Sequence, residues 1–169
     1  MAYQARGLEE NGVIATYKHL IANNMEFERK SAHGIIDENT LRDLYLRVFD
    51  KAFSLYKPGC VMTSYNPVNG IYPCENSALL NDLLRGEWGF DGFVMTDWGS
   101  YDTADSIRSV CAGTNLLTPG SKKHFRMILK AVKRNEISKA ALQHSVKQIV
   151  KVLVRCICCL LYTSDAADD

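Results

Sequence analysis

Short, continuously apolar runs alternate with amphipathic segments along this chain. Runs of this length, rich in β-branched residues, are typical of strands buried on both faces of a parallel sheet. The first three runs are followed by polar pairs, Lys18-His19, Ser64-Tyr65 and Asp97-Trp98. We therefore expect four strands, at residues 13–17, 60–63, 92–96 and, as a shorter segment, 115–117.

The segments between and after these runs carry apolar residues at i, i+3 and i+4, the spacing of a helix that buries one face. Asp37 and Ser138 are suited to cap helix N-termini, and Gly89 is suited to end a helix. We expect helices at residues 37–53, 76–88, 101–111, 125–133 and 139–153.

Alternating strands and helices indicate an α/β fold built on a parallel sheet, either an open doubly wound sheet or a (β/α) barrel. The first strand is not followed by a GxGxxG motif, so nothing favours a dinucleotide-binding sheet. Polar residues at the carboxyl ends of the strands favour the barrel, whose active sites gather there. A complete (β/α)8 TIM-type barrel needs about 250 residues. Four strands therefore predict its C-terminal half.

Composition excludes several classes of protein. With 47% hydrophobic and 23% charged residues, the 169-residue chain is typical of a globular protein. A net charge of +1 gives no footprint for nucleic acid or an anionic membrane. There is no apolar run near the length of a transmembrane helix, and the first residues lack the pattern of a signal peptide. The sequence assigns no cellular compartment.

The six cysteines show no CxxC pair and no zinc-finger spacing, so we expect neither a metal site nor a disulfide framework. The last residues, CLLYTSDAADD, resemble the translation of a sequencing adapter. We expect residues 156–169 to be a non-native tail, and residues 1–155 to be one partial domain.

Four long segments resemble glycoside hydrolase family 3, the β-glucosidase-like enzymes. They are VMTSYNPVNGIYPCEN at 61–76, LNDLLRGEWGFDGFVMTDWGS at 80–100, GVIATYKHLIANN at 12–24 and AGTNLLTPG at 112–120. A helix at 38–49 is similar as well. The resemblance covers residues 8–155 and implies the second half of the family's N-terminal barrel.

The resemblance implies a retaining glycosidase, which needs two carboxyl groups about 5–5.5 Å apart and no metal or organic cofactor. Asp97 matches the catalytic nucleophile, and Lys18 and His19 match a sugar-binding pair. Tyr65 matches a tyrosine beside the nucleophile, while Met62 and Trp98 match residues that line the sugar pocket. By residue type alone, Asp97 is also suited to cap a helix. Lys18 suits a solvated helix start, and His19, Tyr65 and Trp98 suit core packing.

The implied substrate is a sugar with a terminal β-D-glucosyl residue. Lys18-His19 is followed by Leu-Ile-Ala-Asn rather than the Pro-Gly-His-Gly of the N-acetylglucosaminidase branch, which favours a β-glucosidase or a β-xylosidase. Met25 and Asn115 stand where the family often has Gln and Asp, and these differences bear on substrate preference. Glu87, Asp91 and Asp102 flank the motif and are expected to be solvated caps.

The general acid/base and the first barrel half, with further sugar-binding residues, are expected outside this chain. We therefore expect the chain alone to be inactive and, with an apolar sheet face uncovered, poorly soluble. A non-catalytic carbohydrate-binding half-barrel is the alternative from another class. A barrel aldolase is a third reading, with Lys18 its only candidate for a Schiff base.

Overall fold

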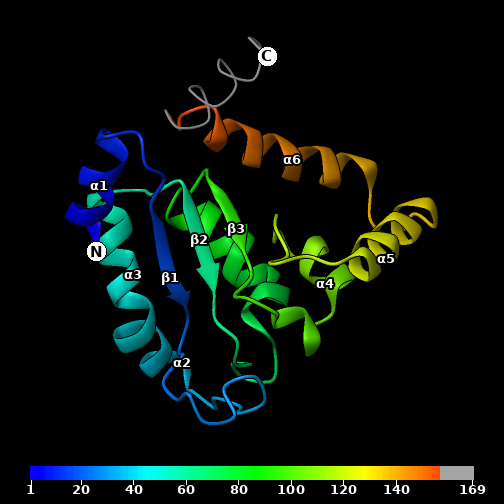
Figure 1. Ribbon diagram of the computed structural model, residues 1–169. Helices are drawn as coiled ribbons and strands as arrows, with labels where there is room; N and C mark the ends of the chain where they lie inside the picture. Colours follow the sequence, from blue (N-terminus) through cyan, green and yellow to red (C-terminus); the bar gives the residue numbers. More distant parts are fainter. Residues whose placement is uncertain (157–169) are drawn as a thin grey trace.

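The computed structural model describes residues 1–156, so all of the expected non-native tail except Cys156 lies outside the described residues. Its centre is a parallel sheet in the order β1-β2-β3 (Figure 1). The strands are β1 (Thr16–Leu20), β2 (Cys60–Thr63) and β3 (Phe93–Met95). Leu116 adds one parallel bridge to Met95, which is all that forms of the strand expected at 115–117. The parallel α/β arrangement is confirmed.

The first strand begins three residues later than the apolar run predicts. Pairing starts with Thr16 opposite Cys60, while Val13 is 45% exposed and belongs to the connection before the strand. Lys18 and His19 consequently lie inside β1 rather than after it. The peptide bond between them is cis.

The helices follow the amphipathic pattern closely, with one addition at the N-terminus. Residues 38–55 form one continuous helix, and Asp37 caps it by accepting a hydrogen bond from the Thr40 amide. The first helix, α1, has no counterpart among the expected helices. The elements are α1 (Ala2–Glu10), α2 (Glu38–Thr40), η1 (Leu41–Leu46), α3 (Arg47–Leu55), η2 (Pro73–Glu75), η3 (Ala78–Glu87), η4 (Ser100–Asp102), α4 (Ser106–Cys111), α5 (Lys122–Lys133) and α6 (Lys139–Leu153).

Capping side chains explain where two predicted helices differ from the observed ones. The helix expected at 101–111 divides into η4 and α4, because the Asp105 carboxylate accepts from the Ile107 and Arg108 amides and starts a new helix there. Helix α5 starts at Lys122 because the Ser121 hydroxyl accepts from the His124 amide. Within residues 1–156, none of the helices has the length and apolarity to span a membrane.

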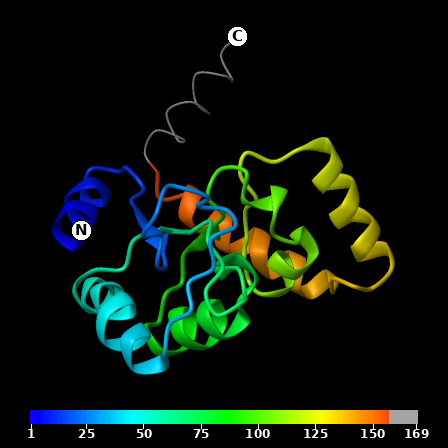
Figure 2. The same ribbon diagram turned by 90° about the horizontal axis from the view of Figure 1, so that it is seen from below.

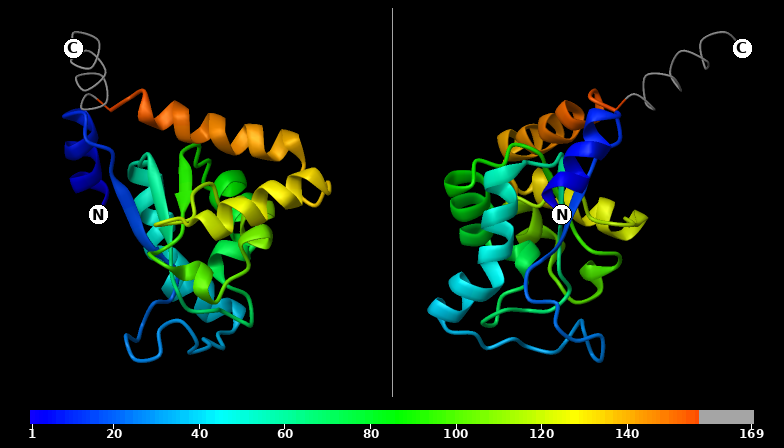
Figure 3. Two further views of the ribbon diagram at one scale, coloured as in Figure 1. Left: turned by 45° about the vertical axis from the view of Figure 1, so that its right-hand side comes forward. Right: turned by 90° about the vertical axis from the view of Figure 1, so that its left-hand side faces the viewer.

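The helices enclose the sheet unequally. One face packs against α3 and η3, and the main core lies between them (Figure 3). Its buried side chains include Tyr17, Phe53, Val61, Leu80, Leu84, Phe90 and Val94. Helix α6 crosses the end of the sheet where the strands begin, and Val152 packs there on Cys60 and Phe93 (Figure 1). The opposite end, where the strands finish, carries the loops and faces the viewer in Figure 2.

Asn115 holds the third strand in place from two sides. Its amide oxygen accepts from the Val94 amide at 2.7 Å and from the Arg85 guanidinium at 3.0 Å. Its amide nitrogen donates to Ser145 and Gln148 of α6. This side chain therefore joins β3, η3 and α6, a structural task remote from the sugar preference that the sequence comparison raised for it.

Glu9 sets the starting points of the first two strands. One carboxylate oxygen accepts from the Ala15 amide at 3.1 Å and the Gly59 amide at 2.6 Å, directly before β1 and β2. The other accepts from the Tyr56 hydroxyl at 3.1 Å. A carboxylate that satisfies two backbone donors at once aligns two strands from a helix the apolar pattern did not reveal.

We predict that Glu9→Ala lowers the free energy of unfolding by about 2–3 kcal/mol, because it leaves two amides and a hydroxyl without their acceptor. Urea denaturation of the whole chain, followed by circular dichroism, measures the change. Glu10→Ala is the matched control, since Glu10 pairs with Arg6 at the exposed surface and its loss costs less than about 1 kcal/mol. Equal effects of the two substitutions would contradict this role of Glu9.

Candidate active site

The strand register brings three polar side chains to one edge of the sheet. His19 is the fourth of the five residues of β1, Tyr65 lies two residues after β2, and Asp97 lies two residues after β3. Because the strands are parallel, their carboxyl ends lie side by side, although the register of β1 on β2 shifts between Tyr17 and Leu20. This is the end of the sheet opposite α6, where barrel enzymes place their reactive groups.

Both oxygens of the Asp97 carboxylate are held. Oδ2 lies 3.2 Å from Nε2 of His19, and Oδ1 accepts from the Trp98 amide at 2.6 Å. The Asp97 side chain is only 13% exposed. A mostly buried carboxylate with a fixed neighbour at each oxygen has a defined orientation, as a nucleophile requires.

His19 faces Asp97 as a mostly buried imidazole. Burial lowers the pKa of His19, and this effect outweighs the opposing influence of the Asp97 carboxylate; Lys18 and Arg29 lower the pKa further. The ring is therefore neutral near pH 7, and its Nε2 atom lies against the carboxylate at 3.2 Å.

Tyr65 supports the residue after Asp97. Its buried hydroxyl donates to the Trp98 carbonyl at 2.5 Å. Burial, followed by the nearby Asp97 charge, raises the pKa of Tyr65, so the hydroxyl keeps its proton. The guanidinium of Arg29 lies 4.5 Å from the ring centroid and the ammonium of Lys30 lies 5.5 Å from it.

Arg29 and Lys30 were not among the sequence candidates. They lie in the long loop after β1, and only its return across the sheet edge brings them to Tyr65 (Figure 1). The sequence of residues 21–36 contains no pattern that predicts this contact. A charged pair in a loop is ordinarily a solvated surface feature.

The remaining candidates lie around this cluster. The Trp98 side chain is 66% exposed, so its ring is open to solvent. Lys18 is exposed and Met62 partly buried. Val61, the neighbour of Met62, packs in the helix-covered core, so strand alternation puts Met62 on the other face. The same rule does not apply to Lys18, because the register of β1 shifts between Tyr17 and Leu20. The structure thus joins Asp97, His19, Tyr65 and Trp98 through direct polar contacts, whereas within residues 1–156 Lys18 and Met62 form no hydrogen bond or ion pair with Asp97.

Among residues 1–156, no three or more His, Cys, Asp and Glu side chains gather as a metal would require. Cys60 and Cys74 are buried, which raises the pKa of their thiols to about 12 and about 11 respectively. Neither thiol is therefore a nucleophile near neutral pH.

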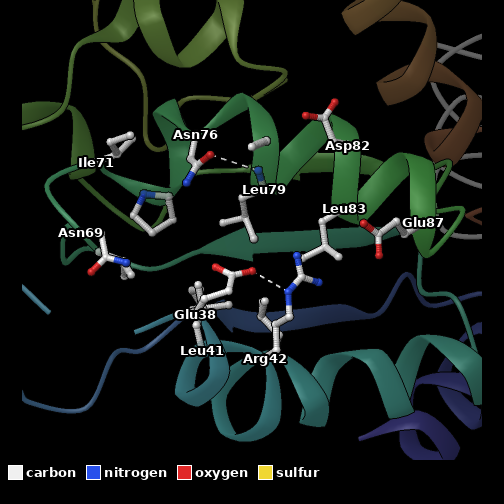
Figure 4. A pocket seen from close by; sticks show the side chains of 15 residues that line it. Glu38, Leu41, Arg42, Asn69, Ile71, Asn76, Leu79, Asp82, Leu83 and Glu87 are labelled. Atoms are coloured by element: carbon white, nitrogen blue, oxygen red, sulfur yellow. Dashed lines mark hydrogen bonds and ion pairs between the residues drawn. The ribbon is translucent and has the colours of Figure 1, made fainter. Parts of the chain in front are cut away.

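A groove of about 430 Å³ lies elsewhere, on the outer helical layer between α2–η1 and η3 (Figure 4). Its walls include Leu41, Leu79 and Leu83, and Glu38 and Arg42 pair at 2.5 Å on its rim. None of the candidate site residues lines this groove. The volume of this groove is therefore no reason to regard it as the active site.

Comparison with known proteins places the chain in a family. The family model described as "Glycosyl hydrolase family 3 N terminal domain" matches residues 1–152. "Probable beta-glucosidase J" of Aspergillus fumigatus is 39% identical over 150 residues, which are 87% of this chain and 17% of that protein. "Probable beta-glucosidase I" of Aspergillus flavus is 38% identical over 154 residues, 89% of this chain and 18% of that protein.

Solved structures agree. Beta-glucosidase 3B from Thermotoga neapolitana, in complex with glucose, superimposes with a TM-score of 0.89 at 36% identity, covering 95% of this chain and 23% of that chain. The GH3 beta-glucosidase of Bifidobacterium adolescentis gives a TM-score of 0.85 at 32% identity, with 92% and 23% covered. The expected fold, half of a TIM-type barrel, is confirmed. The chain spans less than a fifth of the curated relatives it matches, and it belongs to glycosyl hydrolase family 3.

Proposed function

We propose that this chain supplies the nucleophile side of the active site of a retaining β-glucosidase, which hydrolyses terminal β-D-glucosyl residues. The observation that carries the proposal is the Asp97 carboxylate, held between His19 and the Trp98 amide at the carboxyl edge of a parallel sheet. Membership of the family and the β-glucosidase relatives support it.

In the proposed reaction one oxygen of Asp97 attacks the anomeric carbon, and the bond from that carbon to the leaving oxygen breaks. A second carboxyl group gives its proton to the leaving oxygen. Water then attacks the glycosyl ester and returns a proton to the second carboxylate, which frees the sugar and Asp97. We place the second carboxyl group outside this chain.

The neighbours of Asp97 have distinct roles in this proposal. Neutral His19 lies against Oδ2 of Asp97, and its other ring nitrogen, Nδ1, accepts a hydrogen bond from a sugar hydroxyl. The Lys18 ammonium donates to sugar hydroxyls. Tyr65 fixes the Trp98 backbone through its hydrogen bond to the Trp98 carbonyl. The exposed indole of Trp98 then offers a flat surface on which a sugar ring can stack. Met62 forms an apolar wall on the open face of the sheet.

The proposed protein is larger than this chain. We propose that residues 1–155 are part of one barrel domain, that residues 156–169 are not native to it, and that the other barrel half and a second domain complete the site. The two carboxyl groups and water suffice for glycosyl transfer, so no cofactor enters the proposal.

Trapping the intermediate tests the role of Asp97. We would graft residues 1–152 in place of the matching segment of the Thermotoga neapolitana enzyme and treat this chimera with 2-deoxy-2-fluoro-β-glucosyl fluoride. Mass spectrometry is expected to find the sugar on Asp97. Asp97→Asn is expected to lower kcat by about 10³-fold or more, as loss of a nucleophile does in other covalent enzymes.

Asp91→Asn is the matched control, because Asp91 is an exposed carboxylate of the same segment that pairs with Lys151; it should leave kcat unchanged. A label on a different residue, or an active Asp97→Asn chimera, would rule out Asp97 as the nucleophile. Faster trapping by the xylosyl analogue would make the enzyme a β-xylosidase.

The isolated 169-residue chain is expected to show no turnover of 4-nitrophenyl β-glucoside, because it lacks the proposed acid. Release of nitrophenol over hours, compared with buffer, measures this. Robust turnover that disappears in Asp97→Ala would show that the chain is a complete catalyst. Saturable binding of cello-oligosaccharides by the chain, with an inactive chimera, would instead favour the non-catalytic carbohydrate-binding half-barrel.

Stability is expected to fall below about pH 6.5 because of His19. Its pKa is lowered in the folded state, so the unfolded chain binds the proton more readily. The stabilising contribution of neutral His19 is present above its unfolded pKa and is lost as the pH falls through its folded pKa. His19→Gln should therefore lose less stability than the original chain between pH 7.5 and pH 5 in urea denaturation.

His33→Gln is the control for this titration, since His33 is exposed in the loop after β1. Its pH dependence should match that of the unchanged chain. Identical pH dependence in His19→Gln would show that the His19–Asp97 contact is not coupled to folding.

A further inference from the structure

The turn that carries Asp97 is bound from three directions. His19 of β1 contacts the Asp97 carboxylate, and Tyr65 donates to the Trp98 carbonyl. The Lys30 ammonium donates to the Gly99 carbonyl at 3.2 Å. Three consecutive residues are thus each held by a side chain from a different part of the chain.

Lys30 makes a second contact at the same place. Its ammonium lies 2.8 Å from a carboxylate oxygen of Asp102, three residues beyond Gly99. Asp102, expected to be a solvated cap, is therefore an ion-pair partner, and Lys30 lowers its pKa. The backbone of Lys30 is also fixed, because its carbonyl accepts from the Tyr72 hydroxyl at 3.2 Å.

Gly99 shows how closely this pair covers the turn. Its φ of +79° is a left-handed conformation that favours glycine. A Cβ atom at this position would lie 3.4 Å from the Lys30 ammonium and 3.3 Å from the Asp102 carboxylate. The ion pair therefore packs directly against the backbone that follows Asp97 and Trp98.

We propose that Lys30 is a positioning residue: with Asp102 it clamps the turn at residues 97–99 and so keeps the Asp97 carboxylate and the Trp98 ring in place for the sugar. The inference rests on the proposed function and adds a residue that does not contact Asp97. Lys30 acts through the Gly99 carbonyl and through the ring of Tyr65, 5.5 Å from its ammonium.

The charge of Lys30 is essential to this role. A neutral side chain of equal length would still cover Tyr65 but would leave the Gly99 carbonyl and the Asp102 carboxylate without their shared donor. An arginine keeps the charge and offers several donors to two acceptors. Lys30→Met and Lys30→Arg therefore separate the clamp from simple packing.

Hydrogen exchange in the whole 169-residue chain tests the clamp without any activity. The amides of Ser100, Asp102 and Ala104 bond within the turn, and Lys30→Met should raise their exchange rates roughly fivefold or more. Lys30→Arg should restore protection. Lys51→Met, on an exposed position of α3, is the matched control and should change nothing in residues 98–104.

Kinetics of the chimera test the consequence for the reaction. Lys30→Met should lower kcat about 10-fold with KM changed less than about twofold, because a displaced nucleophile affects the transition state more than binding. Asp102→Asn should show a similar loss, and the double variant should lose little more, since both substitutions break the Lys30–Asp102 ion pair that holds the ammonium at the turn. Lys30→Arg should recover most of the rate.

The two experiments separate the clamp from the proposed function. Normal exchange at residues 98–104 in Lys30→Met, or additive losses in the double variant, would overturn the clamp even when Asp97 is labelled. An unlabelled chimera would overturn the proposed nucleophile, while the exchange rates would still decide whether Lys30 holds the turn.

Discussion

The parallel register of three short strands is the constraint on which the rest of the structure depends. Thr16, Cys60 and Phe93 start in line, and because the strands run parallel, side chains far apart in the sequence meet at one edge even though the register of β1 on β2 shifts between Tyr17 and Leu20. Glu9 enforces the common start by binding the amides before β1 and β2. A slip of one residue would turn the buried face of a strand outward and carry His19 away from Asp97.

At the carboxyl edge of the sheet, neutral groups contact the Asp97 carboxylate, whereas cationic side chains contact Tyr65. The carboxylate of Asp97 meets a neutral imidazole and a backbone amide, while the cations Arg29 and Lys30 lie over the ring of Tyr65. Within residues 1–156, the Asp97 carboxylate is thus oriented by a backbone amide and an imidazole rather than by an ion pair with lysine or arginine. The positive charges of Arg29 and Lys30 instead lie against Tyr65, whose hydroxyl binds the Trp98 carbonyl next to Asp97.

The sequence pattern predicts those parts of this fold that depend on local order. The strand at 60–63 and the helix at 139–153 match because an apolar run and a serine cap define them within a few residues. The long segments that resemble the family identify Asp97 and His19 as candidates. The parallel order of the strands explains why the two side chains meet. The pairing of Lys30 with Asp102 cannot be predicted from the local sequence, because it depends on the loop after β1 lying beside the turn that follows β3. Helix α1 has only two buried alanines, Ala2 and Ala5, and so gave little apolar signal.

The hydrogen bonds of Asn115 connect the last helix to the strand that precedes Asp97. The same amide group that binds β3 at Val94 also binds α6, which crosses the far end of the sheet. The strand that leads to Asp97 is therefore anchored through one side chain to a helix at the opposite end of the sheet. Shortening Asn115 would remove its hydrogen bonds to β3 and to α6 together.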